Sequence, residues 1–238
     1  MLEFSFGEVE AILSAVHRIR PDKAVAFRAR LKHLQREGWP MGANTGTGKK
    51  AVYTLNSLMQ MAMALELLQV GITPKRAVAA LLAGWSDLAL SILVSRVSGH
   101  QLMAWEDSPL RAGEELFWVI RPEALQDLSL ETREVRPGNL EILVQRSDQV
   151  MPDLLSFTED AYVDFGPLWR SLVIRVQLIV IAVDLEIFKV RPGIEVDYLL
   201  RAGCEEIGQL GLNSADNRLA KSLKTFLVSL PAISGGAA

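Results

Sequence analysis

The sequence predicts a mainly α-helical protein with some β structure. Apolar residues recur at helical spacing through most of residues 6–82, and short β-prone runs bounded by turn residues follow them. Half of the 238 residues are apolar and 22% are charged, the composition of a folded globular chain. This length accommodates two modest domains. We expect a first domain at 1–88, a second domain at 89–228 with an α+β or helical fold, and a flexible tail at 229–238.

Two helices joined by a short turn are predicted at the start of the chain. Apolar spacing places the first helix at 6–19, and Pro21 and Asp22 then interrupt the pattern, with Asp22 as the N-cap of the next helix. The second helix spans 23–37 and stops at Gly38, a residue type that favours helix ends. Its apolar stripe is narrow and most of its other positions are basic or polar, which suits a helix that packs on one side and meets phosphates on the other.

A glycine-containing segment separates the second helix from the third. Residues 39–54 hold three glycines and several small polar residues, and they lead into a β-prone piece at 51–54. Glycines of this kind supply the backbone freedom that tight turns need. The pattern predicts a flexible hairpin tip, or wing, that carries Lys49 and Lys50.

Two strongly apolar helices are predicted after the wing. The first spans 55–70 and ends at Gly71. The next begins with Thr73 as its cap and Pro74 at the first helical position, and it is expected to close at the Gly-Trp pair 84–85. A helix, a turn, a basic helix, a wing and two further helices together predict a winged helix-turn-helix module in the first domain.

The second domain has a less regular pattern. Residues 88–97 are expected to be helical or mixed, and the runs 115–120 and 140–145 are expected to be strands. The Val- and Ile-rich stretch 172–188 fits a strand, a helix, or a strand that runs into a helix, because periodicity alone does not decide between them. A short amphipathic helix is expected at 196–210.

Positive charge is concentrated in one part of the chain. The whole chain has a formal net charge of −3, yet between His17 and Lys50 nine Lys and Arg residues oppose only Asp22 and Glu37, which gives this segment +7 and the rest −10. Such charge acts locally, because salt screens it within about 8–10 Å. A solvated helix face is the alternative, but such faces usually mix both signs. We predict that the segment binds duplex DNA or another polyanion through Arg18, Arg20, Lys23, Arg28, Arg30, Lys32, Arg36, Lys49 and Lys50.

The order of these elements resembles the winged helix-turn-helix domain of MerR-type bacterial regulators. Arg36-Glu37-Gly38 matches the end of that family's second helix directly, and Leu31-Lys32 stands where the family has Leu-Arg. His33-Leu34 replaces a tyrosine pair of the family pattern. The segment 71–74, Gly-Ile-Thr-Pro, corresponds to the turn between the next two helices. The resemblance covers about a third of the chain.

The resemblance implies how the module would meet DNA. The second helix would enter the major groove and the wing would lie along the flanking backbone. It also implies a homodimer paired through helices after the DNA-binding domain, with an effector module beyond, for which a small molecule or a protein is the effector. By the same resemblance the groove or phosphate contacts are Arg28, Lys32, His33 and Arg36, and the wing contacts are Lys49 and Lys50.

No catalytic residue, metal site or cofactor is expected. Cys204 is the single cysteine, and His17, His33 and His100 lie at no metal-motif spacing and beside no nucleophile signature. The first residues lack the design of a signal peptide, and the longest unbroken apolar run in the most apolar stretch, 178–183, is short for a membrane span. We expect a cytoplasmic, nucleoid-associated protein with no membrane partner.

The leading hypothesis is a bacterial, sequence-specific transcription regulator that acts as a homodimer on a pseudo-palindromic site of double-stranded DNA. One alternative keeps the DNA-binding module but makes the protein an accessory factor for recombination or phage packaging, similar in role to an excisionase. Another makes the acidic second domain the main activity, as a ligand- or protein-binding module. The sequence favours the first hypothesis because its clearest signal is the basic helix with the wing beside it.

Overall fold

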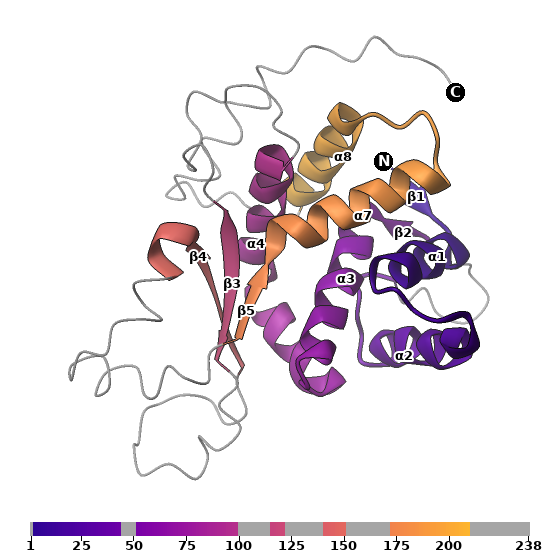
Figure 1. Cartoon of the computed structure of the whole chain (residues 1–238), viewed down its shortest axis with the longest axis horizontal. Coiled ribbons are helices and arrows are strands. Elements are labelled where there is room, and N and C mark those ends of the chain that lie inside the picture. The colour runs from indigo at the N-terminus through magenta and orange to yellow at the C-terminus, as the bar shows by residue number, and fades with distance from the viewer. Residues whose placement is uncertain (1, 44–50, 100–114, 122–139, 151–171, 210–238) are drawn as a thin grey trace.

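The structure is mainly helical with two small antiparallel sheets, which confirms the predicted balance of α and β (Figure 1). The computed structural model describes residues 2–43, 51–99, 115–121, 140–150 and 172–209. In chain order the elements are β1 (Glu3–Phe4), α1 (Phe6–Val16), the 3-10 turn η1 (Pro21–Lys23), α2 (Ala24–Arg36), β2 (Tyr53–Thr54), α3 (Leu55–Gln69), α4 (Pro74–Gly99), β3 (Leu116–Arg121), β4 (Glu141–Arg146), β5 (Leu172–Arg175), α7 (Val176–Val190) and α8 (Val196–Gln209).

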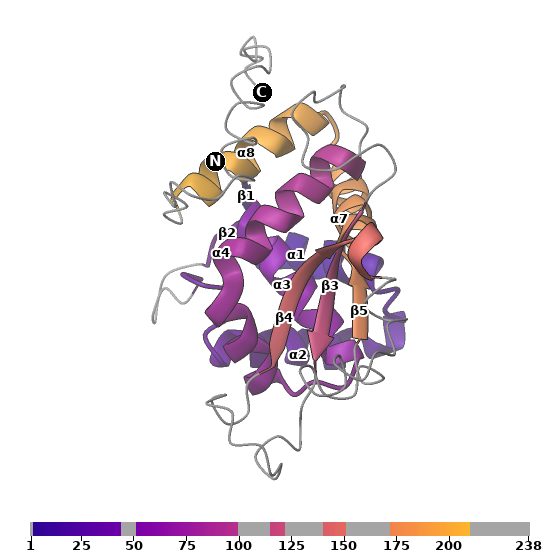
Figure 2. The same ribbon diagram turned by 90° about the vertical axis from the view of Figure 1, so that its left-hand side faces the viewer.

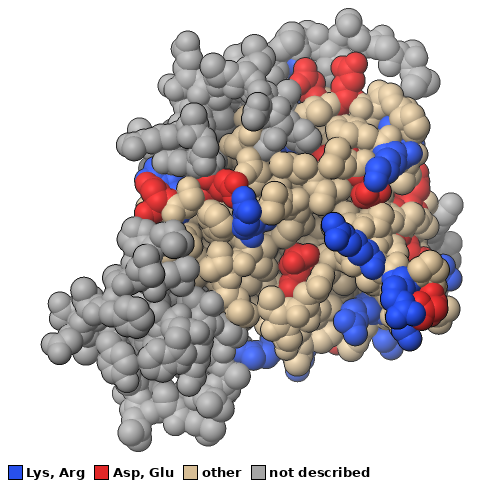
Figure 3. All heavy atoms as spheres, viewed as in Figure 1, with Lys and Arg blue, Asp and Glu red and all other residues tan. Residues whose placement is uncertain are grey.

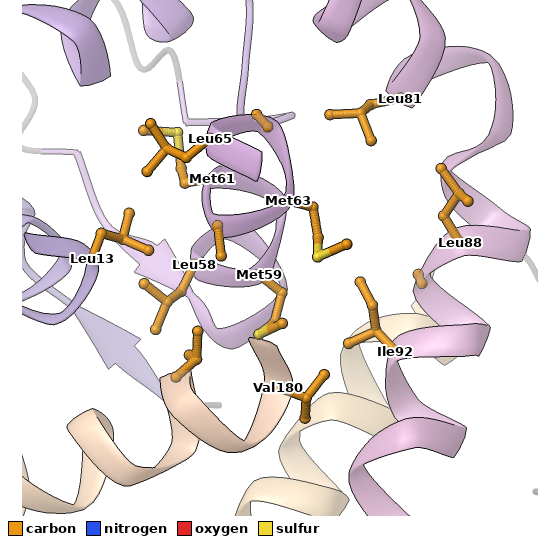
Figure 4. Close-up of a cluster of buried hydrophobic side chains, with 14 of the residues drawn as sticks. Leu13, Leu58, Met59, Met61, Met63, Leu65, Leu81, Leu88, Ile92 and Val180 are labelled. Atoms are coloured by element: carbon orange, nitrogen blue, oxygen red, sulfur yellow. The ribbon is translucent and has the colours of Figure 1, made fainter. Parts of the chain in front are cut away.

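Helix α3 is the centre of the core. Eleven of its fifteen residues are buried, because helices cover it on several sides. Figure 4 shows Leu13 of α1 on one side of α3, Leu88 and Ile92 of α4 on the other, and Val180 of α7 below. A helix surrounded in this way must be apolar around most of its circumference, which explains the broad apolar face of this segment in the sequence.

The larger sheet has the strand order β4-β3-β5 and packs against α4 and α7 (Figure 2). Trp118 in the central strand faces the helices, and its indole Nε1 donates a hydrogen bond to Ser91 Oγ at 2.9 Å. The two predicted strands are confirmed with a shift of one residue. The stretch 172–188 is a strand that runs directly into a helix, one of the three alternatives that the periodicity allowed.

Helix α4 is longer than the sequence predicts. The expected end at Gly84–Trp85 is wrong, because the helix continues without a break to Gly99. Gly84 is an ordinary helical residue, since a Cβ there would meet the Leu88 side chain at 3.8 Å, a normal contact. Trp85 continues the buried face of the helix. The same helix crosses position 88, and one cluster of buried side chains extends to both sides of it, so the division of the chain there stays a prediction.

Within the described ranges, α4 is also the one helix long and apolar enough to cross a membrane by length and composition. Most of its apolar window, 61%, is buried inside the structure, where α4 packs against α3, α7 and α8. A central core helix has this same composition, because it too is surrounded by apolar neighbours.

The end of helix α7 is fastened to the start of the chain. Arg191, which follows α7, donates from Nε to Glu8 Oε1 at 2.7 Å and from Nη2 to the backbone oxygen of Glu3 at 3.2 Å. Glu8 also completes a capping box on α1, in which its carboxylate accepts the Ser5 N–H at 2.8 Å. The hydrogen bond from Arg191, followed by that from the Ser5 backbone, lowers the pKa of Glu8 to about 2.

Replacing Arg191 with alanine is expected to lower the free energy of unfolding at pH 7 by about 1 kcal/mol, because the pair is partly exposed. The low pKa of Glu8 in the folded chain contributes stability above about pH 4.5, and this contribution is lost as the pH falls toward 2. Urea unfolding at several pH values should therefore show a shallower acid dependence in Arg191→Ala than in the wild type. Lys189→Ala, which removes an exposed cation from the same helix, should keep the wild-type acid dependence.

Candidate nucleic-acid interface

Three buried residues pack helix α2 against the core, and most of its other residues are exposed. Phe27, Leu31 and Leu34 are buried, as the narrow apolar stripe predicts. The predicted N-cap role of Asp22 is wrong, because Asp22 lies within the 3-10 turn and α2 begins after Lys23 with no side-chain cap. The turn is possible because α1 ends at Val16, three residues earlier than predicted. Arg18 then takes a left-handed conformation with φ of 51° that reverses the chain.

The segment after α2 fixes the end of the helix to α3. Gly38 ends α2 with a φ of +86°, as predicted. Trp39 is fully buried, donates from Nε1 to the backbone oxygen of Gln60 at 2.7 Å, and packs edge-on against Trp85 with ring centroids 5.3 Å apart. The N–H of Met41 donates to the Gln60 side-chain oxygen at 2.7 Å. The position of α2 is therefore set by a buried anchor at its C-terminal end.

The base of the predicted wing is paired with the start of the chain. Strand β2 pairs with β1 in an antiparallel register that places Phe4 opposite Tyr53. Tyr53 is fully buried, its ring lies 6.2 Å from that of Phe6, and its hydroxyl is hydrogen-bonded to Gln35 of α2. The expected wing tip, with Lys49 and Lys50, lies outside the described residues. What the structure describes is a buried tyrosine that links the base of this segment to the basic helix.

Of the predicted DNA-binding residues, eight are described, and they divide into two groups. One group is occupied by carboxylates: Arg28 by Glu10 at 2.8 Å, Arg20 and Lys23 both by Asp22, and His33 by Glu37 at 3.3 Å. The other group forms no ion pair and no side-chain hydrogen bond in the part of the chain that the structure describes. This unpaired group consists of Arg18, Arg30, Lys32 and Arg36, all of them exposed.

The outermost stripe of α2 combines apolar and cationic residues. Val25, Ala29, Lys32 and Arg36 follow one another at spacings of four, three and four residues, so they lie on one face of the helix, opposite the buried stripe. All four are exposed. In the space-filling view, Lys and Arg side chains gather at the lower right, over α2 and the turn before it (Figure 3). This face presents two unpaired cations in line, toward which phosphates can approach without displacing a carboxylate.

Two features of this surface were missed by the sequence reasoning. The first is the pairing of Glu10 with Arg28: the packing of α1 on α2 brings the Glu10 carboxylate to Arg28, eighteen residues away. No local sequence pattern predicts a pair between residues so far apart in the chain. The second is the pair of exposed apolar residues Val25 and Ala29, whose place on the face opposite the buried stripe follows from helical spacing alone.

A reactive cysteine and a metal site are two other kinds of functional site, and both have little support among the described residues. Burial raises the pKa of Cys204 to about 12, so its thiol stays protonated and is a poor nucleophile. Searched over the same residues, the structure brings together no group of three His, Cys, Asp or Glu side chains that could hold a metal ion.

Helix α8 contributes a buried carboxylate to the start of α3. Glu206 Oε2 accepts the N–H of Asn56 at 2.6 Å, and Oε1 accepts that of Leu55 at 3.3 Å. Burial raises the pKa of Glu206, while these hydrogen bonds act against the rise. Strand β2 leads directly into α3. Helix α8 is therefore hydrogen-bonded, through Glu206, to the helix that follows the predicted wing.

Known proteins give no further guide to this surface. In comparisons with family models, with curated proteins and with solved structures, none matches the chain.

Proposed function

We propose that this protein binds double-stranded DNA through α2, as a homodimeric, sequence-specific transcription regulator of the bacterial nucleoid. The observation that carries the proposal is the group of unpaired, exposed cations on and beside α2. A cation that has no carboxylate partner among the described residues loses no such ion pair when it binds a phosphate, so its binding free energy is not reduced by that loss.

The shape of the helix supports the same partner. An α-helix with side chains is about 10–12 Å across, which matches a major groove about 12 Å wide. Helix α2 is held by its buried stripe and by Trp39 and Tyr53 beside it, so its outer face is presented on a rigid support. Rigid presentation limits the ordering cost of binding.

The resemblance to MerR-type regulators supports the role of regulator and the homodimer. A two-fold dimer would place two copies of α2 on half-sites one helical turn apart, about 34–36 Å. A pseudo-palindromic site is the expected consequence, since the symmetry of the DNA site mirrors that of the protein.

The proposal predicts a change in salt dependence when the cationic stripe is neutralised. The double variant Lys32→Ala/Arg36→Ala should bind duplex DNA more weakly, and the slope of log K against log salt should become shallower by about 2, roughly 1 for each lost phosphate contact. The measurement is fluorescence anisotropy of labelled duplex at several salt concentrations. Both residues are exposed and unpaired, so the melting temperature should change little.

A matched control removes the same charge elsewhere. Lys189→Ala/Arg146→Ala takes two cations from α7 and β4, where each is paired with a neighbouring carboxylate. This control should keep the wild-type slope. Equal slopes for all three proteins, or wild-type binding that is insensitive to salt, would contradict DNA binding through α2.

A further inference from the structure

The outer face of α2 is divided into an apolar half and a cationic half. Along the outermost stripe, Val25 and Ala29 occupy the N-terminal half, and Lys32 and Arg36 occupy the C-terminal half. Arg28, which is paired with Glu10, flanks the apolar pair. Val25 is 81% exposed, more than any other large hydrophobic residue in the described chain, where the next is Leu185 at 52%. Val25 lies on the solvent side of the helix, so neither packing nor the low helix propensity of valine accounts for it.

The spacing of the two halves fits the dimensions of the major groove. At about 1.5 Å per residue, Lys32 and Arg36 lie roughly 10 and 16 Å along the helix from Val25. With the N-terminal half of the helix following a groove about 12 Å wide and the C-terminal half inclined toward its edge, Lys32 and Arg36 would reach the phosphates that border the groove while Val25 faces the bases. The N-terminal residues of a recognition helix are the ones that meet base edges.

The chemistry of the apolar half selects one kind of base. All four bases present polar groups in the major groove, and valine and alanine side chains can form a hydrogen bond with none of them. Thymine alone presents a methyl group there. Val25 and Ala29 are four residues apart, about 6 Å along the helix, which spans about two base-pair steps of roughly 3.4 Å.

We propose that Val25 and Ala29 read thymine methyl groups, so that the DNA site of this protein contains thymines about two base pairs apart where the N-terminal half of α2 enters the groove. This proposal rests on the proposed DNA binding and adds to it the base that the helix selects. Lys32 and Arg36 supply the affinity for phosphate and the apolar pair supplies the discrimination between bases.

The experiment begins with selection of preferred sites from a random duplex library by the full-length chain. Each thymine of the selected site is then replaced by deoxyuridine, which removes only the C5-methyl group. Wild-type affinity should fall about fourfold at one or two positions and stay unchanged at the others, as expected for one buried methyl group each. In Val25→Ser/Ala29→Ser the same replacements should have no effect, while the salt slope keeps its wild-type value.

Val70→Ser, at an exposed valine outside α2, is the matched control and should retain the penalty for deoxyuridine. Binding of the selected duplex with no loss at any deoxyuridine position, or an equal loss in the serine double variant, would overturn the thymine proposal and leave DNA binding intact. Failure of the wild type to bind any duplex at low salt would instead overturn the proposed function itself, and the thymine proposal with it.

Discussion

Replacing Asp184 with alanine is expected to lower the free energy of unfolding by about 3–5 kcal/mol. Asp184 in α7 and Arg96 in α4 form a bidentate ion pair, with Nε–Oδ2 at 2.8 Å and Nη2–Oδ1 at 2.9 Å. Both side chains are at most 2% exposed. Removal of the carboxylate leaves the Arg96 guanidinium inside the core without the group that binds it, so most of its desolvation cost is no longer offset.

A double variant separates the cost of the orphaned charge from the value of the pair. Arg96→Met/Asp184→Leu replaces both groups with apolar side chains, so it should unfold close to the wild-type free energy or above it. Urea denaturation followed by circular dichroism measures all three proteins. A single variant as stable as the wild type would contradict the predicted cost. A double variant as unstable as the single one would show that the loss does not come from the orphaned charge.

The buried ion pair between Arg96 and Asp184 could not be predicted from the sequence. Asp184 was readable only as a polar interruption of an apolar stretch, because its partner lies 88 residues away and periodicity contains no information about pairing across that distance. The helix ends that glycine and proline set locally, at Gly38, Gly71 and Pro74, were predicted well. Local steric restriction acts through the residue itself, and so it is visible in the chain.

The errors came where packing overrides local preference. Gly84 was taken as the end of a helix, yet α4 passes through it, because burial of Trp85 and Leu88 beside it more than offsets the modest cost of one helical glycine. The partner of β2 was expected within a hairpin, but β1 at the start of the chain provides the observed pairing. Strand pairing depends on which segments the fold brings together, and short strands carry little information about that choice.

The candidate interface was predictable in composition but not in its pairing. The concentration of cations on α2 follows from counting residues, and the buried stripe follows from helical spacing. Which cations stay available for phosphate depends on Glu10, Asp22 and Glu37, and for Glu10 only the packing of α1 against α2 decides this. Among the described residues, the structure therefore separates the predicted cations that pair with a carboxylate from those that do not.

The second large expected effect concerns Trp39, the buried anchor at the C-terminal end of α2. Replacing Trp39 with alanine should lower the free energy of unfolding by about 3–5 kcal/mol, because a fully buried indole is lost and the space around it collapses only in part. The change also removes the edge-on contact with Trp85 and the hydrogen bond to the Gln60 backbone oxygen. Since Trp39 follows α2 directly, the C-terminal end of the basic helix loses its anchor on α3.

Loss of the Trp39 anchor should weaken DNA binding as well as lower stability. At a temperature where Trp39→Ala is still folded, its affinity for duplex DNA should fall, because part of the binding energy must then hold α2 in place. Trp39→Phe keeps an aromatic ring in the core and loses the indole N–H, so it should unfold at an intermediate free energy and bind nearly as well as the wild type. Leu178→Ala, at an exposed position of α7, should change neither quantity. Full DNA affinity in a folded but destabilised Trp39→Ala would show that α2 keeps its position without this anchor.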